Sequence, residues 1–400
     1  MDDPLIFVRA VHFAATLSVA GVALFDIFIA QPTLRPPASA ELRVTVGQHL
    51  AWIAWIGLLL TLLSGAAWFV LVAQSISDEP LASVLSDGGV LRAVLLDTEF
   101  GRNWLLRLLL IGLLVGLLAA GSRGKPAGRG FLELAIAIVA AALAGTLAWA
   151  GHGIGGAGLG GLFHLAADFV HLIAAAAWVG GLLPLALMLA AAAGSVTVAH
   201  AVSLRFSASG IVAVSVLLLT GAINTWYLAG SIRALTETDY GHLLLVKVAL
   251  FLVMLGLATV NRLWLTPALA ADPGQGRSRD AFRQLRRNVA IEISAGAIIL
   301  SVVAEPSTGE RKLVRDRWSC RSPQQHRLRP ALQARQVLIW GAGRSRLDDH
   351  IVDIQVDQEI LPQPPLRRDP APGEQAPEVR LGLSDGHQEC SKKPRRGDRT

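Results

Sequence analysis

Two histidines and an aspartate stand near the start of a strongly apolar stretch of this sequence. His164, Asp168 and His171 form the pattern HxxxDxxH within residues 162–190, LFHLAADFVHLIAAAAWVGGLLPLALMLA. In an α-helix their side chains fall within about 60° of one another, so they make one polar stripe. Two imidazoles and a carboxylate on one face can bind a transition metal ion, and ionisable groups inside a membrane usually mark a functional site. The alternative is hydrogen bonding between packed helices; we favour metal or proton chemistry.

The stretch that carries this stripe is predicted to be a transmembrane helix packed among other such helices. A spanning helix needs about 20 apolar residues, which residues 162–190 provide. The chain has 400 residues, 52% of them hydrophobic, which is too apolar for an ordinary soluble domain. We therefore predict an all-α fold, a polytopic bundle of about eight transmembrane helices. The apolar spans lie roughly at residues 5–30, 47–73, 103–120, 131–150, 162–190, 206–230, 242–264 and 288–303.

The orientation of the bundle follows from the basic residues in its short loops, which favour the cytoplasmic side. Residues 121–130 hold three basic groups and residues 277–287 hold five arginines, whereas the loop 151–161 carries no charge. This bias predicts that both termini lie outside and that the loops after odd-numbered spans are cytoplasmic. The first span lacks a basic start and a small-residue cleavage site, so we expect a retained helix rather than a signal peptide.

This orientation brings several histidines toward the outer surface. The HxxxDxxH stripe occupies the outer half of its span, His12 lies in the outer half of the first span, and His152 lies at the outer end of the fourth. We predict an outward-facing metal site formed by His164, Asp168 and His171, with His152 and His12 as further ligands, although His12 suits helix packing equally well. Both cysteines lie after residue 303 and the chain has only three methionines, so a thiolate site in the bundle is excluded.

Other polar groups and motifs suggest no further chemistry. Asp26 and Glu292 lie toward the cytoplasmic side, where pairing with the basic loops is favoured over an exit step for a cation. Residues 151–156 match GxGxxG, but no β-strand precedes them, so they do not predict a dinucleotide site. The sequence contains no Walker motif, nucleophile triad or zinc-protease motif. We expect no enzymatic activity and no nucleic-acid partner.

Several long runs resemble the copper resistance protein D (CopD) family. The likeness covers roughly residues 5–303, and the runs that carry it are TEFGRNWLLRLLL (98–110), AWAGHGIGGAGLGGLFHLAADFVHLIAAAAWVGGLLPL (148–185), RFSASGIVAVSVLLLTGAINTWYLAGS (205–231) and YGHLLLVKVALFLVMLGLATVNRLWLTPAL (240–269). The resemblance implies an inner-membrane protein that moves copper ions from periplasm to cytoplasm, with a separate periplasmic copper carrier, CopC-like, as its partner. In the inner membrane the outer side is the periplasm, so both termini are expected to be periplasmic.

The resemblance and the apolar composition both stop near residue 303. Residues 304–400 hold 18 of the 36 Lys and Arg and 14 of the 30 Asp and Glu. Such a composition cannot bury a core, so we expect disorder. The sequence thus divides into a transmembrane domain, residues 1–303, and a polar tail, residues 304–400. The tail is either a genuine extension or a frame-shifted product of the gene's end, and we favour the second.

Two other functions remain open for the same histidines. A membrane redox protein would hold haem between helices through axial histidines, which requires partners at matching depth, such as His12 with His164 or His171. A metal-sensing or assembly protein would bind copper without moving it. An absorption spectrum distinguishes a haem protein from a copper transporter. A flux measurement distinguishes a sensing or assembly protein from a copper transporter.

Overall fold

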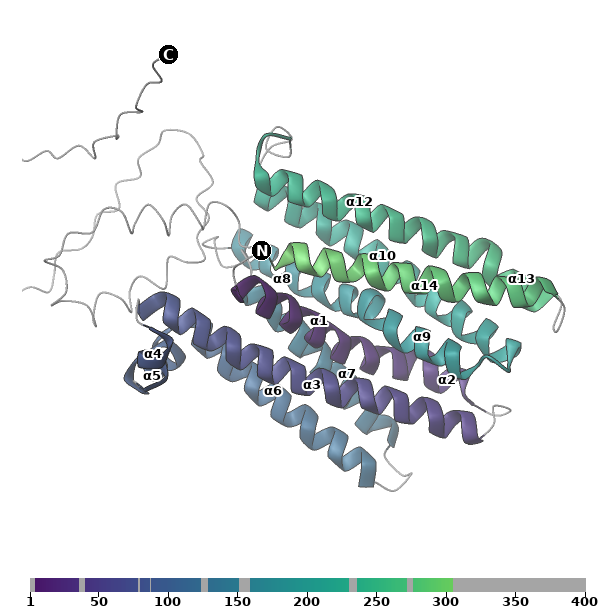
Figure 1. The fold of residues 1–400 in the computed structure, drawn as a ribbon, viewed down its shortest axis with the longest axis horizontal. Helices are drawn as coiled ribbons and strands as arrows, with labels where there is room; N and C mark the ends of the chain where they lie inside the picture. Colours follow the sequence, from purple (N-terminus) through teal and green to yellow (C-terminus); the bar gives the residue numbers. More distant parts are fainter. Residues whose placement is uncertain are drawn as a thin grey trace, which may run out of the picture.

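The fold is described from a computed structural model, which places residues 4–35, 40–77, 80–86, 88–123, 129–150, 159–229, 236–271 and 276–304. Within these ranges every regular element is helical, which confirms the all-α prediction. Most helices run side by side along one axis (Figure 1). His152, the glycine motif and the tail lie outside the described residues.

The first half of the bundle consists of long helices joined by short ones. Its elements are α1 (Pro4–Phe25), η1 (Asp26–Ala30), α2 (Gln31–Thr33), α3 (Ala40–Ser77), α4 (Leu81–Ser86), α5 (Gly88–Asp97), α6 (Glu99–Arg123), α7 (Arg129–Gly145) and η2 (Thr146–Ala150). The second half consists of α8 (Leu159–Ala175), η4 (Ala176–Gly180), α9 (Gly181–Ala191), α10 (Val196–Ala229), α12 (Asp239–Val260), η5 (Asn261–Leu265), α13 (Thr266–Ala271) and α14 (Gly276–Val303).

Seven of the described helices are long and apolar enough to cross a membrane, so the chain is a multi-pass bundle as predicted. They are Pro4–Thr33, Ala40–Ser75, Glu99–Gly121, Gly130–Trp149, Leu159–Ala191, Val196–Tyr227 and Gly241–Ala270. The eighth predicted span falls in α14, whose first half is rich in arginine and whose buried face packs against α12 and α13. Two helices, α3 and α10, begin several residues before the predicted spans, at Ala40 and Val196.

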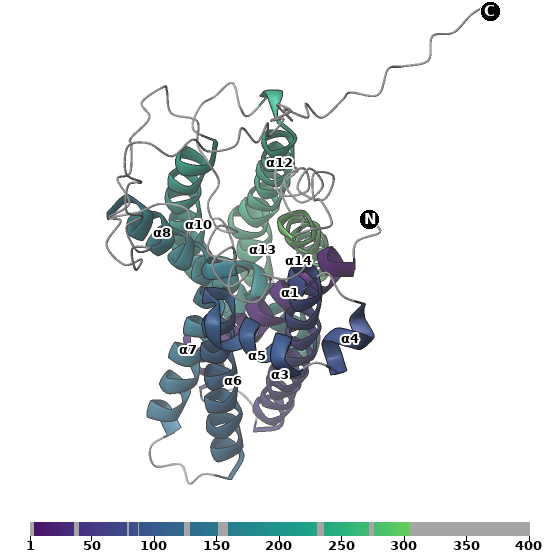
Figure 2. The same ribbon diagram turned by 90° about the vertical axis from the view of Figure 1, so that its left-hand side faces the viewer.

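The centre of the bundle is α1, which packs against α3, α7, η4, α9 and α14. The closest approach is between Gly21 of α1 and Gly180 at the end of η4, where a Cβ on either residue would overlap the backbone of the other helix. η1, η4 and η5 are short π-helical turns inside long helices, a feature that often marks functional positions. Seen from the end, α8, α10, α12, α13 and α14 lie to one side of α6 and α7 (Figure 2).

The stretch between the second and third predicted spans also contains helices. The structure forms α4 and α5 there, beside the end of α3 and on the same end of the bundle as the N terminus (Figure 1). Val84 and Val94 are buried together with Ala73 of α3. Their burial explains why this charged segment still folds into helices.

Candidate functional site

The HxxxDxxH stripe lies on α8, as predicted, and its whole length faces α10. Each of its three side chains contacts a different residue of α10, in antiparallel order. These contacts are a stacking of His164 on Tyr227 with ring centroids 5.0 Å apart, a 3.1 Å hydrogen bond from Asn224 Nδ2 to Asp168 Oδ1, and a 2.8 Å hydrogen bond between His171 Nδ1 and Thr220 Oγ1. The stripe therefore takes part in helix packing whatever else it does.

The hydrogen bonds of Thr220 define the proton position on His171. The Thr220 hydroxyl donates to the carbonyl oxygen of Val216, 2.6 Å away, one turn back in α10. A hydroxyl has a single proton, so Thr220 Oγ1 accepts from His171, and Nδ1 carries the imidazole proton. The lone pair of His171 is then on Nε2, the atom through which a metal ion would bind.

The stripe is shielded to different degrees along its length: His164 is buried, and Asp168 and His171 are half-buried. His164 is 7% exposed although it stands in the second turn of α8, so Tyr227 and its neighbours cover it. Asp168 supplies a carboxylate on the same face of α8. A cation bound at this face would need imidazole and carboxylate ligands together.

His12 belongs to a different polar cluster, formed by α1, α3, α6 and η2. Its Nε2 lies 3.2 Å from Nη1 of Arg107, and its Nδ1 lies 3.1 Å from both the carbonyl oxygen of Thr61 and Oγ of Ser64. A guanidinium group only donates, so His12 Nε2 is the acceptor and Nδ1 carries the proton. His12 is thus a neutral imidazole with both nitrogens engaged.

Arg107 is 2% exposed, and its charge is held entirely by neutral partners among the described residues. Besides His12, its Nε donates to Thr146 Oγ1 at 3.1 Å and its Nη2 to the Thr146 carbonyl oxygen at 2.9 Å. The guanidinium also lies 5.6 Å and 6.0 Å from the ring centroids of Trp68 and Trp104. Cation–π contacts of this kind help to offset the cost of a charge in the bundle interior. Arg107 therefore lies inside the bundle and does not extend to its surface.

The structure does not assemble the predicted ligand set in one place. Across the described ranges no three His, Cys, Asp or Glu side chains stand close enough together to hold a metal ion. His12 would have to give up its contact with Arg107 to bind copper or haem. His152 lies outside the described residues. The stripe on α8 is the part of the predicted site that the structure brings onto one helix face.

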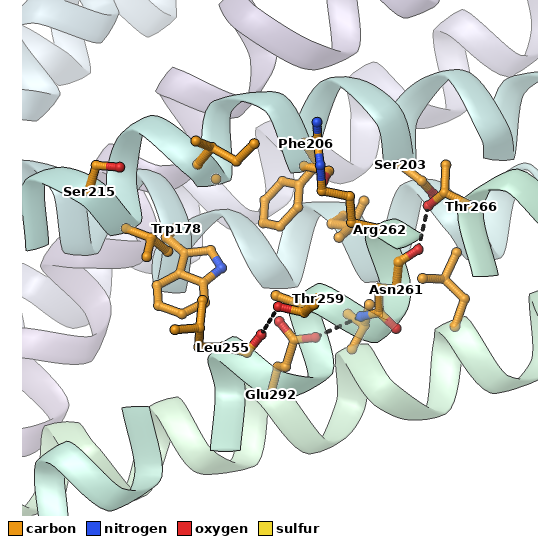
Figure 3. A pocket seen from close by; sticks show the side chains of 18 residues that line it. Trp178, Ser203, Phe206, Ser215, Leu255, Thr259, Asn261, Arg262, Thr266 and Glu292 are labelled. Atoms are coloured by element: carbon orange, nitrogen blue, oxygen red, sulfur yellow. Dashed lines mark hydrogen bonds between the residues drawn. The ribbon is translucent and has the colours of Figure 1, made fainter. Parts of the chain in front are cut away.

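A third polar cluster surrounds a cavity of about 180 Å³ at the π-helical turn η5 (Figure 3). Asn261 Nδ2 donates to Glu292 Oε1 at 2.8 Å, and Asn288 Nδ2 donates to Asn261 Oδ1 at 2.7 Å. Glu292 was predicted to pair with a basic loop, but its partner is this amide. Nearby, Arg262 Nη1 donates to Ser207 Oγ at 2.9 Å. The signal that sequence analysis missed is the polar pair at 261–262 inside an otherwise apolar span.

The fold and these buried polar clusters define a multi-pass helical membrane protein. Residues 1–162 match the copper resistance protein D-like, N-terminal domain, and residues 200–305 match copper resistance protein D. The chain is 32% identical to copper resistance protein D of Pseudomonas syringae pv. tomato, an alignment that covers 76% of this chain and 96% of that protein. The chain therefore belongs to the copper resistance protein D family, as its resemblance predicted.

Two further relatives extend this comparison. The inner membrane protein YebZ of Escherichia coli (strain K12) is 30% identical over 76% of this chain and 97% of its own length. The copper transport protein CutJ of Bacillus subtilis (strain 168) is 38% identical over 24% of this chain and 18% of its own length. No solved structure matches the chain significantly. The protein is thus a copper-related membrane protein.

Proposed function

We propose that this protein moves copper ions across the inner membrane, from the periplasm to the cytoplasm, and so contributes to copper resistance. The observation that carries the proposal is the stripe of His164, Asp168 and His171 on one face of α8. Family membership supports copper as the ion. Imidazole and carboxylate groups are suitable copper ligands.

The proposed copper site uses atoms that the packing with α10 leaves available. His171 donates to Thr220 through Nδ1 and offers Nε2. Asp168 accepts from Asn224 through Oδ1 and offers its second oxygen. His164 and His152 would complete the ligand set, with His152 coming from the segment that leads into α8. His12 is a weaker candidate, because Arg107 occupies its lone pair.

The direction of movement rests on the predicted orientation. Basic residues favour the cytoplasm for the loops after odd-numbered spans, which places both termini and the start of α8 on the periplasmic side. Copper would then reach the stripe from the periplasm, delivered by a separate CopC-like carrier. Relatives named for copper resistance and for the inner membrane support this assignment.

The test is copper uptake into cells that make the wild-type protein or the double variant His164→Ala, His171→Ala. Uptake is normalised to the amount of folded protein in the membrane. A matched control removes two other histidines, His49 and His200, which lie on α3 and α10 near the opposite end of the bundle. We expect the stripe variant to lose uptake and the control to keep it. Normal uptake by a well-folded stripe variant would show that the stripe only packs helices.

A further inference from the structure

The cavity at η5 contains a buried carboxylate that copper handling at the stripe does not use. Glu292, in the middle of α14, is 2% exposed and lines the cavity together with residues of α10, α12 and η5. Its only hydrogen bond among the described residues is the one from Asn261 to Oε1. An ionisable group in the interior of a membrane bundle is costly and is usually functional. Glu292 therefore requires an explanation beyond packing.

The π-helical turn creates the surroundings of Glu292. Because the backbone N–H of Thr266 bonds to the carbonyl oxygen of Asn261, the helix widens at η5. The Asn261 side chain then reaches α14, where it donates to Glu292 (Figure 3). It also accepts a hydrogen bond from Asn288. This chain of amides holds one carboxylate oxygen in place. Glu292 remains part of the cavity wall, and about 180 Å³ is room for several water molecules.

The charged groups around the cavity favour a proton over a metal ion. Arg262 is the other charged residue in the described lining, it donates to Ser207, and it forms no ion pair with Glu292. α9, η4 and α13 carry no titratable residue. The titratable residues of α1, α10 and α12 are not among the described residues that line the cavity; they are Arg9, His12, His200, Arg205, Tyr227, Asp239, Tyr240, His242 and Lys247. A metal ion would meet one carboxylate, no imidazole and a guanidinium group, which is a poor ligand set. A proton needs only the carboxylate.

We propose that Glu292 is a reversible proton-binding site, reached through the cavity between α10, η5 and α14. The bound proton removes the buried negative charge, and the amide of Asn261 can bond to either form of the carboxyl group. Buried carboxylates serve as proton relays in many membrane pumps and transporters. This proposal does not depend on copper transport, because the site and its titration can be measured without copper.

The experiment uses dicyclohexylcarbodiimide, an apolar reagent that modifies protonated carboxyl groups in membrane proteins. The full chain in lipid nanodiscs, without copper, is treated over a series from mildly acidic to mildly alkaline pH, and the labelled residue is identified by peptide mass spectrometry. We expect label on Glu292 that falls about tenfold for each pH unit above its midpoint. The variant Glu292→Gln should carry no label at this position.

Two further variants make the result specific. Arg262→Gln removes a positive charge from the cavity wall, so the midpoint of labelling should move to higher pH. Arg277→Gln, at the exposed start of α14, should leave the midpoint unchanged. Absence of label on Glu292 at every pH, or label that does not change with pH, would overturn the proposal. Protection by copper or sodium at constant pH would also overturn it, because a metal ion would then occupy the site.

Discussion

Replacing Thr220 by Val tests separately whether the α8 stripe packs helices and whether it binds copper. The substitution keeps the shape of the side chain but removes the hydroxyl that accepts the 2.8 Å hydrogen bond from His171 Nδ1. The matched control is Thr225→Val, five residues further along α10. Thr225 Oγ1 donates only to the carbonyl oxygen of Gly221 in its own helix. Both variants lose one threonine hydroxyl, but only Thr220→Val frees His171 to rotate or to move its proton.

The expected effects on copper binding and on folding differ in size. Losing the partner that orients a metal-binding histidine typically weakens metal affinity about 10–100-fold, or about 1.4–2.7 kcal/mol. Hydrogen bonds between membrane helices contribute about 0.6 kcal/mol on average to folding. Thr220→Val should therefore weaken copper binding by more than it destabilises the fold. Thr225→Val should change either quantity by less than about 0.5 kcal/mol.

The assay is equilibrium copper binding to the protein in nanodiscs, in competition with a chelator of known affinity. Thermal unfolding of the same samples measures the change in stability. Copper affinity of Thr220→Val equal to that of Thr225→Val would refute the reasoning, because His171 would not be a ligand held by Thr220. Equal losses in affinity and stability would indicate that the stripe acts only in packing.

Three other predictions concern the bundle as a whole. Gly180→Ala should destabilise the protein by about 1–3 kcal/mol, because the added Cβ meets the backbone of α1. Gly256→Ala, which meets nothing within 4 Å inside α12, should not lower the thermal midpoint, because alanine favours a helix more than glycine does. A chain truncated after residue 304 should insert and fold like the full protein, since the family match ends at residue 305; degradation of the truncated chain alone would contradict this. A cysteine placed at Gly128 should resist an impermeant reagent in intact cells, and its labelling would reverse the predicted topology.

The HxxxDxxH pattern was sufficient to place three side chains on one helix face, because helical periodicity alone determines that arrangement. Their partners were not predicted, because rotation and register between helices depend on packing. A signal was nevertheless present. Thr220, Asn224 and Tyr227 form a second polar stripe on α10 with the same spacing of four and then three residues. Two matching stripes in neighbouring spans predict an antiparallel contact.

His12 and Glu292 illustrate why depth in the membrane is not enough to predict the partners of a buried polar residue. His12 starts in the same half of the bundle as the α8 stripe, but α1 turns it toward Arg107. Glu292 lies on the same helix as five arginines, yet the widened turn η5 brings the amide of Asn261 to it. Hydropathy and charge bias give the level of a residue along the membrane normal. They do not give the direction in which it faces, and a π-helical turn changes that direction for every residue after it.

Hydrogen bonding to α10 does not by itself decide whether the stripe packs helices or binds copper. Each pairing uses one polar atom, Nδ1 of His171 or Oδ1 of Asp168, and both groups have a second atom that can bind a metal ion. A fixed Nδ1–H orients the ring and makes Nε2 a better ligand, so the packing contacts are compatible with the proposed copper site. No three candidate ligands converge within the described residues, so a copper site at the stripe needs a further ligand from elsewhere in the chain. His152, twelve residues before His164, is the nearest imidazole in sequence.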